Sequence, residues 1–340
     1  MKTILQTLNG TPISPPPIWL MRQAGRHLEE YLNLRSRADT FLDFCYSPDM
    51  AVEATLQPIR RYGMDAAILF SDILVIPDAL GQRVSFVPGQ GPQLAPLNGR
   101  ASIKQLDPTN LHDHLAPVYE SIRRLKTLLP EATALIGFAG APWTVATYMI
   151  EGGGSKDCQK TRTYAYEATD DFQVLIDLLV ETTAAYLIRQ ADEGAEVIQV
   201  FDSWAGVLPP IQFDAWVIRP FQKIVAAVKA AHPGLPIIGF PRGAGLGYAT
   251  FAAQTGVDAV SLDSTVPLAW AAKNVQPNAV IQGNLDNLIL RAGGHQLKAA
   301  VGEILTTFSA KPFIFNLGHG VLPDTPVAHV EQLLDMVRGG

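Results

Sequence analysis

The stretch Val174–Asp202, VLIDLLVETTAAYLIRQADEGAEVIQVFD, contains the unit that decides the fold. Its first part, Val174–Glu193, carries apolar residues at helical spacing and ends before Gly194, a residue type that commonly terminates helices. Its second part, Glu196–Phe201, is a short apolar run followed by the polar Asp202. Because this run is apolar on successive residues rather than on alternate ones, it is typical of a strand buried on both faces, as in parallel sheets. The stretch therefore predicts a helix followed by a parallel strand.

Similar apolar runs recur along the whole chain, with helical patterns between them. Including Glu196–Phe201 there are eight, and the other seven are Ile18–Met21, Ala66–Phe70, Ala134–Phe138, Pro236–Phe240, Ala259–Asp263, Ala279–Gly283 and Phe313–Leu317. This alternation fits either a (β/α)8 barrel or an open doubly wound sheet. No glycine-rich phosphate loop is present, which favours the barrel.

Two further segments complete the predicted architecture. The long interval between the second and third runs contains Gln82–Leu97, QRVSFVPGQGPQLAPL, which is typical of a β-hairpin. Phe213–Ala231 has the spacing of a helix that ends before Pro233. We therefore predict an α/β fold, a (β/α)8 TIM barrel, as a single domain over residues 1–340 with an N-terminal extension and a hairpin insertion.

Composition narrows the function. The chain of 340 residues is 48% hydrophobic and only 17% charged, below the roughly 25% typical of soluble proteins, so much of it must be interior. A formal net charge of −6 argues against a non-specific nucleic-acid binder, and we expect no nucleic-acid partner. The two cysteines, Cys45 and Cys158, cannot build a disulfide framework and fit a reducing compartment. Met1–Gly10 holds no apolar run of signal-peptide length, so we expect a cytoplasmic protein without a membrane partner.

Polar side chains follow the apolar runs, where a barrel carries its functional groups. The segments are Arg22-Gln23-Ala24-Gly25-Arg26, Ser71-Asp72, Gly140-Ala141-Pro142-Trp143, Asp202-Ser203-Trp204, Pro241-Arg242-Gly243, Asp263-Ser264, Asn284-Leu285-Asp286 and Gly318-His319-Gly320. We therefore expect a ligand site at the carboxyl ends of the strands.

The segment Met21–Arg26, MRQAGR, is the most informative of these. Two guanidinium groups lie on either side of a small Ala-Gly pair, so the backbone can approach a ligand while both arginines face it. Arginine binds carboxylate or phosphate through two parallel hydrogen bonds and stays charged. Arg35 extends this basic cluster. The alternative is a helix start with solvated arginines.

Asp72 follows one apolar run and precedes another, Ile73–Ile76. A carboxylate in such surroundings needs hydrogen-bond donors or a cation, so Asp72 is either a ligand-binding acid or a helix N-cap. Tyr148, in the expected helix Pro142–Ile150, is either core packing or part of the site.

Two more candidate site residues lie just beyond the ends of predicted strands. Ser203 would need a histidine base to act as a nucleophile, and His319 is the one histidine on the predicted rim. The chain has no G-x-S-x-G motif, which argues against a hydrolase triad. His319 itself is either a site residue or a turn histidine bonded to backbone. No cysteine pair or H-E-x-x-H motif occurs, and we expect no metal site.

Several separated motifs occur together in this chain: Trp19–Arg26 (WLMRQAGR), Phe70–Leu74 (FSDIL), Gly140–Gly154 (GAPWTVATYMIEGGG), Gly283–Asp286 (GNLD) and Asn316–Asp324 (NLGHGVLPD). In this order they resemble the uroporphyrinogen decarboxylase family over essentially the whole chain. The family pattern continues past MRQAGR with Tyr, Pro and a further Arg, whereas this chain has His27 and Leu28 and, in place of the arginine, Leu32.

The resemblance implies a barrel enzyme that acts as a homodimer, without metal or cofactor. Such an enzyme converts the four acetate side chains of uroporphyrinogen to methyl groups, releasing carbon dioxide and giving coproporphyrinogen. By motif match, the substrate-binding residues would be Arg22, Gln23, Ala24, Gly25, Arg26, Arg35, Asp72, Tyr148, Ser203 and His319. Arg22 and Arg26 would bind carboxylates and Asp72 the pyrrole N–H groups, with Asp72, Arg22 and Tyr148 as the catalytic residues.

The chemistry agrees with these residues. Decarboxylation leaves an electron pair on carbon, and a pyrrole protonated on carbon can accept it, while Asp72 stabilises the positive ring. The residues leave the proton donor open among Arg22, Tyr148 and a water molecule. Two alternatives are a corrinoid- or methionine-synthase-like methyltransferase, which would need zinc ligands, and a non-catalytic tetrapyrrole-binding protein, which would not need Asp72.

Overall fold

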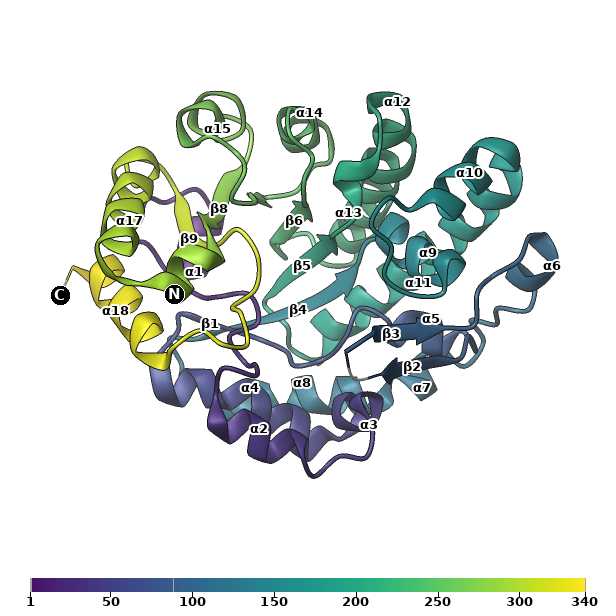
Figure 1. Cartoon of the computed structure of the whole chain (residues 1–340), viewed down its shortest axis with the longest axis horizontal. Coiled ribbons are helices and arrows are strands. Elements are labelled where there is room, and N and C mark those ends of the chain that lie inside the picture. The colour runs from purple at the N-terminus through teal and green to yellow at the C-terminus, as the bar shows by residue number, and fades with distance from the viewer. Residues whose placement is uncertain (1, 88, 340) are drawn as a thin grey trace.

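The computed structural model describes residues 2–87 and 89–339, and its centre is a curled parallel sheet of seven strands (Figure 1). The strands follow one another in chain order: β1 (Ala66–Ile68), β4 (Ala134–Gly140), β5 (Val197–Asp202), β6 (Ile237–Pro241), β7 (Ala259–Ser261), β8 (Val280–Leu285) and β9 (Phe313–Leu317). Every neighbouring pair is parallel. The prediction of a TIM-barrel-like α/β fold is confirmed.

The first predicted strand, Ile18–Met21, is wrong as a regular strand. Only one bridge forms, from Ile18 to Phe315 of β9. The segment nevertheless lies between the two edges of the sheet, because the Phe315 N–H donates to the Pro17 carbonyl and the Asp65 N–H, just before β1, donates to the Ile18 carbonyl. It therefore occupies the position of an eighth strand without forming a ladder.

Side chains explain the missing ladder. Pro17 has no N–H, and the N–H groups of three residues that follow it donate to side chains: Ile18 to Asp65 (2.8 Å), Leu20 to Gln23 (3.0 Å) and Met21 to Asn316 (3.1 Å). A parallel ladder needs these donors for backbone carbonyls. The local bonds replace it.

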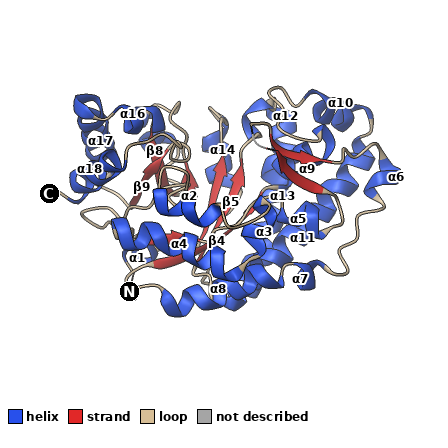
Figure 2. Ribbon diagram, turned by 60° about the horizontal axis from the view of Figure 1, so that its bottom comes forward, coloured by secondary structure: helices blue, strands red, loops and turns tan. Residues whose placement is uncertain are grey.

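Helices surround the sheet, most of them on its outer side, while α1 (Thr3–Leu8) packs against its inner layer (Figure 2). They are α1 (Thr3–Leu8), α2 (Glu29–Arg35), α3 (Phe41–Tyr46), α4 (Pro48–Tyr62), α5 (Val75–Ala79), α6 (Arg100–Ile103), α7 (Leu111–His114), α8 (Ala116–Leu128), α9 (Pro142–Glu151), α10 (Gln159–Glu167), α11 (Thr169–Glu193), α12 (Pro210–Phe213), α13 (Arg219–Ala231), α14 (Gly247–Gln254), α15 (Leu268–Asn274), α16 (Asn287–Ala292), α17 (Gly294–Phe308) and α18 (Val327–Arg338). Gly194 ends α11, as its sequence predicts. The single helix expected over Phe213–Ala231 is interrupted by a π-helical turn, Asp214–Ile218, just before Pro220, which cannot donate a helical hydrogen bond.

The predicted hairpin is present as β2 (Val84–Val87) and β3 (Gly91–Leu94), which pair antiparallel. It packs against the end of α9, where the Leu94 N–H donates to the Gly152 carbonyl and the Leu97 N–H to the Met149 carbonyl, both at 2.9 Å. The insertion therefore supports the helix that carries Tyr148.

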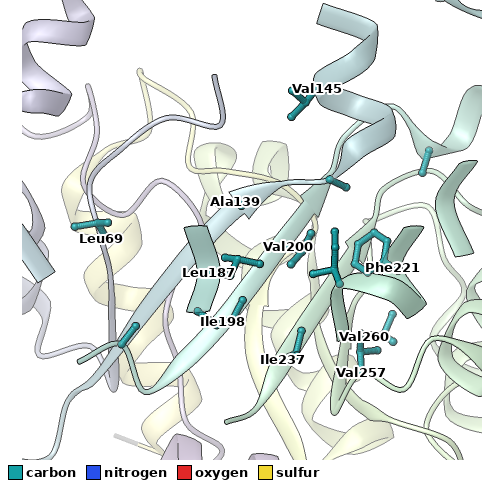
Figure 3. Packing of buried hydrophobic residues seen from close by; sticks show 14 of the residues in the cluster. Leu69, Ala139, Val145, Leu187, Ile198, Val200, Phe221, Ile237, Val257 and Val260 are labelled. Atoms are coloured by element: carbon teal, nitrogen blue, oxygen red, sulfur yellow. The ribbon is translucent and has the colours of Figure 1, made fainter. Parts of the chain in front are cut away.

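Two apolar layers hold the sheet. The larger lies between strands and outer helices, where residues such as Ile198 and Val200 of β5 meet Leu187 of α11 and Phe221 of α13 (Figure 3). The smaller fills the inside of the curled sheet, and Ile4 of α1 packs into it. Each fully buried side chain of this size stabilises the fold by about 1.5–3 kcal/mol.

A polar network also lies inside the curled sheet. The Trp19 indole N–H donates to Gln282 (2.8 Å), and the Gln282 amide donates to Gln199 (3.1 Å) and to Ser261. All four residues are fully buried, so these bonds satisfy groups that would otherwise be costly to bury.

Among the described residues, no helix combines the length and the apolar composition that a membrane-spanning helix requires.

Candidate active site

The loop that carries Arg22 and Arg26 is a tight turn rather than the start of a helix, since α2 begins only at Glu29. Gln23 anchors it: its side chain is buried, accepts from the Leu20 N–H and donates to the Ala66 carbonyl of β1 at 3.0 Å. Both amide atoms of Gln23 are thus bound within the protein. The neighbouring Arg22 and Arg26 are exposed.

Arg22 occupies a constrained position. Its φ of +60° lies in the left-handed region, which non-glycine residues seldom adopt. A Cβ placed on Gly320 would clash with Cδ of Arg22, so the arginine stem crosses directly over Gly320. The His319 loop and the arginine loop therefore touch, and the glycine makes the contact possible.

Asp72 lies in the loop after β1 and is half-buried. It does not cap a helix, since Leu74 is the N-cap of α5; its carboxylate accepts from the Leu74 N–H at 2.8 Å. Burial raises the pKa of Asp72 to about 6, while the Leu74 N–H and the positive charge of Arg22 limit the rise. Asp72 is thus an acid that titrates near neutral pH beside a fixed cation.

Tyr148 is the partly exposed residue in the buried stretch Pro142–Ile150 of α9. Burial, and then the negative charge of Asp72, raise the pKa of Tyr148, while Trp204 and Arg22 act in the opposite direction. A close contact brings these elements together, because a Cβ on Gly140 would lie 2.9 Å from Cβ of Ile73, next to Asp72. Tyr148 is therefore a neutral hydroxyl within the range of the Asp72 charge.

His319 follows β9 and its Nδ1 accepts from the Gly320 N–H at 2.7 Å. Because Nδ1 is an acceptor, the ring hydrogen is on Nε2. Burial, then the charges of Arg242 and Arg22, lower the pKa of His319 to about 4. The ring is therefore neutral at physiological pH.

Arg35 lies next to the site residues described above. Its guanidinium donates to the Ala38 carbonyl at 2.8 Å and stands 5.9 Å from the ring centroids of both Phe41 and Phe44. The charges of Arg35, Arg26 and Arg22 all act on Tyr31, whose pKa burial raises to about 12. Within residues 2–87 and 89–339, these three arginines form no ion pair with a carboxylate.

The remaining predicted site residues make few side-chain interactions. Ser203 directly follows β5 and is half-buried, and among the described residues its hydroxyl has no hydrogen-bond partner. Ala24 and Gly25 are half-buried in the arginine turn, where a Cβ on Gly25 would meet the Arg22 carbonyl oxygen at 2.8 Å. The small residues are thus needed by the turn itself. Leu32, at the departure from the family pattern, is 47% exposed on α2.

Arg242, which reasoning from the sequence placed on the rim but did not select, acts on His319. Its loop is held by Asp263, which accepts from the Gly243 N–H (2.7 Å) and the Tyr248 hydroxyl (2.8 Å). Although burial raises the pKa of Asp263, the hydrogen bonds from Thr265, Tyr248 and Gly243 bring it below its usual value. For both Arg242 and Asp263, the signal available in the sequence was a polar residue that directly follows a predicted strand.

Fold and site together define a class: a barrel enzyme whose strand ends present unpaired arginines around an acid that titrates near neutral pH, suited to an anionic small molecule. Comparison with known proteins is more specific. The model of the family described as uroporphyrinogen decarboxylase matches residues 1–340. The chain is 55% identical to the uroporphyrinogen decarboxylase of Rhodospirillum rubrum, covering 99% of this chain and 97% of that one, and 53% identical to that of Chelativorans sp., covering 100% and 98%. The chain belongs to the uroporphyrinogen decarboxylase family.

Solved structures support the fold. A methyltransferase from Methanosarcina mazei superposes with a TM-score of 0.79 at 18% identity, covering 99% of this chain and 98% of that one. A B12-independent methionine synthase from Shewanella gives 0.55 at 10% identity, covering 86% and 87%. At these identities the similarity concerns the fold alone, and the sequence comparisons favour the decarboxylase over the methyltransferase alternative.

Proposed function

We propose that this chain is a carboxy-lyase that decarboxylates the acetate side chains of uroporphyrinogen to methyl groups, giving coproporphyrinogen. Its family membership carries the reaction type, and one structural observation supports the assignment: Asp72, Arg22 and Tyr148 act on one another's charge at the carboxyl end of the sheet. A polycarboxylate with a central set of N–H donors matches a site with free arginines and a recessed carboxylate.

Asp72 is the proposed acceptor for the pyrrole N–H groups. With a pKa of about 6 it is mostly ionised at neutral pH, and a positive ring bound beside it would keep it so. Protonation of a pyrrole carbon makes the ring an electron acceptor; the bond from the acetate methylene to its carboxylate then breaks, and carbon dioxide leaves. Proton addition to the methylene carbon and loss of the first proton complete the conversion. Arg22 and Tyr148, the two residues that are candidate proton donors, both lie beside Asp72.

The remaining residues are assigned to binding. Arg22, Arg26 and Arg35 would hold substrate carboxylates, and Ser203 and His319 would contact the substrate as neutral hydrogen-bonding groups. Gln23 fixes the loop rather than contacting substrate, since both its amide atoms are already bonded. None of these assignments needs a metal or cofactor.

We further propose one domain over residues 1–340 that acts as a homodimer in the cytoplasm. Elements from α1 to α18 surround a single large sheet. Ile211, in α12, and Leu246, the N-cap of α14, are 81% and 78% exposed; the segments after β5 and β6 that carry them touch at Gly206 and Gly243, so they offer an apolar surface to a second copy. Cys45 and Cys158 are free and buried, as a reducing compartment favours. Light scattering after size exclusion tests the dimer.

Anaerobic incubation with uroporphyrinogen tests the reaction. We expect carbon dioxide release and products that lose up to four carboxyl groups, resolved by chromatography after oxidation to porphyrins. A protein that binds uroporphyrinogen without releasing carbon dioxide would instead be a tetrapyrrole-binding protein. Methyl transfer to a corrinoid or thiol acceptor would favour the methyltransferase.

A further inference from the structure

Asp202 is a buried acid that the proposed reaction does not use. It is the last residue of β5, is 0% exposed, and lies one residue before Ser203. Its Oδ1 accepts from the Thr144 hydroxyl at 2.5 Å, while Oδ2 has no partner among the described residues. A buried acid with one free oxygen is costly to keep unless it has a role.

The hydrogen bonds lead from Asp202 toward Tyr148. Thr144, on α9, donates to Asp202 and accepts from the Trp204 N–H at 3.1 Å. The Trp204 carbonyl accepts from the Trp143 indole at 3.0 Å, so both sides of the Trp204 residue are held by α9. The Trp204 ring meets the Tyr148 ring edge-on, with centroids 5.9 Å apart. Asp202 is therefore linked through two residues to a side chain of the site.

We propose that Asp202 is a positioning residue of the decarboxylase, which orients the Thr144 hydroxyl so that Thr144 and Trp204 together fix the ring of Tyr148. This inference rests on the proposed function only for its effect on turnover. Without an acceptor at Asp202, the Thr144 hydroxyl turns to a backbone carbonyl three or four residues earlier, that of Ala141 or Gly140 just before α9, and the Trp204 N–H loses its partner.

The protonation of Asp202 matters for this role. Burial raises the pKa of Asp202 to about 7, and hydrogen bonding from Thr144 opposes the rise. Ionisation would leave a buried charge on an oxygen without a partner, which would disturb the network. Oδ1 accepts from Thr144 in both forms of the acid, and we expect the change of charge on Asp202 to reach Tyr148 through Thr144 and Trp204.

Neighbouring groups do not obscure this titration. β4 and β6, which flank β5, contain no titratable side chain, and after β6 Arg242 contributes its backbone N–H to the Asp202 carbonyl at 3.0 Å. On α9, Glu151 is bonded to Thr161. In the π-helical turn packed on α9, Asp214 pairs with Arg219.

Cys158, before α10, also faces Asp202, and Arg162 of α10 acts on its thiol. Burial raises the pKa of Cys158 to about 12, and burial raises that of Tyr148, so neither changes charge near pH 7. Asp72, with a pKa of about 6, is the acid whose charge acts directly on Tyr148, so its titration must be distinguished from that of Asp202.

The first experiment uses Thr144→Val, which removes the linking hydroxyl, and Thr147→Val as the matched control. Thr147 is equally buried on α9, but its hydroxyl donates only to the Trp143 carbonyl of the same helix. We expect Thr144→Val to lower kcat about tenfold with KM within about twofold, and Thr147→Val to leave both unchanged, because small displacements of a catalytic group are costly to turnover. In a Tyr148→Phe background, Thr144→Val should add no further loss. Multiplying losses, or equal effects of the two valines, would overturn the inference.

The second experiment uses Asp202→Asn, which keeps the shape of the neutral acid. We expect it to retain most of kcat, because its amide oxygen still accepts from Thr144, and to remove the part of the pH dependence of kcat that Asp202 contributes between pH 6 and pH 8.5. A pH dependence identical to that of the wild type between pH 6 and pH 8.5 would contradict the role of Asp202.

A third measurement does not depend on activity. With 3-fluorotyrosine incorporated, the Tyr148 signal in 19F NMR, assigned by its loss in Tyr148→Phe, should shift with pH as two acids titrate, the lower step from Asp72 and the upper step from Asp202. Asp202→Asn should remove only the upper step, and Thr144→Val should weaken it. If the wild type releases no carbon dioxide, the proposed function fails while this titration still decides the link from Asp202 to Tyr148. A Tyr148 titration that Asp202→Asn leaves unchanged would refute the link.

Discussion

Replacement of Asp72 by Asn should make the protein more stable and nearly inactive at the same pH. The asparagine keeps the size of the side chain and an oxygen that accepts from the Leu74 N–H, which Asp72 binds at 2.8 Å. It removes only the charge. Function and stability should therefore change in opposite directions, which a general loss of structure cannot produce.

The size of the stability change follows from the pKa. Burial raises the pKa of Asp72 from 3.8 to about 6, a little over two units, and one unit corresponds to about 1.4 kcal/mol. Between these two values the folded protein binds more protons than the unfolded chain, so the free energy of unfolding falls as pH rises through this window. Allowing for the partial exposure of Asp72 to water, the ionised acid costs about 2 kcal/mol at pH 8.

Asp72→Asn should remove this free-energy cost of burying the ionised acid. We expect its free energy of unfolding in urea to exceed that of the wild type by about 2 kcal/mol at pH 8, and the difference to vanish below about pH 4. Asp107→Asn is the control with the opposite sign, because the hydrogen bonds of Thr109 lower the pKa of the exposed Asp107, and removing that charge should not stabilise the protein.

Turnover should fall about 100- to 1000-fold, since losing one preorganised electrostatic contact to the transition state costs about 3–4 kcal/mol. Carbon dioxide release from uroporphyrinogen under anaerobic conditions measures it. A variant that turns over within tenfold of the wild type, or one that is less stable at pH 8, would refute this account of Asp72.

The other predictions concern the loops around Asp72. Arg22→Ala and Arg26→Ala should each raise KM for uroporphyrinogen, and more at about 20 mM than at about 500 mM NaCl because salt screens exposed charges; equal losses at both would argue against charge recognition. His319→Ala should lower kcat less than Asp72→Asn does, and NMR of the wild-type ring should show it neutral down to about pH 5, since burial and two arginines lower its pKa to about 4. Gln23→Ala should lower the free energy of unfolding by about 1–3 kcal/mol, because two buried partners lose their hydrogen bonds.

Strand positions could be predicted because they depend on local composition. Runs such as Ala134–Phe138 and Phe313–Leu317 are buried on both faces, and each coincides with a strand. Ile18–Met21 has the same composition but forms a single bridge. Its hydrogen-bond donors are taken by Asp65, far away in the sequence, among others, and such a long-range partner leaves no periodic signal.

The site was predictable only in part for the same reason. Arg22, Asp72 and His319 follow apolar runs, and this position identified them before any contact was known. The anchoring role of Gln23 depends on a bond to the Ala66 carbonyl of β1, 43 residues away. The raised pKa of Asp202 depends on burial beneath α9, and no pattern around FDSWAG indicates that.

The negative net charge of the chain is compatible with its proposed acidic substrate. Arginines on the outer helices pair with acids, whereas those near the strand ends do not. On the outer helices arginines are neutralised locally: Arg61 pairs with Glu30 at 2.8 Å and Arg123 with Glu193 at 2.9 Å. At the strand ends, Arg22 and Arg26 have no such partner within the described residues, and the acid that Arg22 acts on, Asp72, has a pKa raised by burial. An ion pair already formed there would have to be broken by each incoming carboxylate, which would weaken binding. Free arginines at one edge of an acidic protein are therefore what recognition of a polycarboxylate requires, and a net charge of −6 carries no information about it.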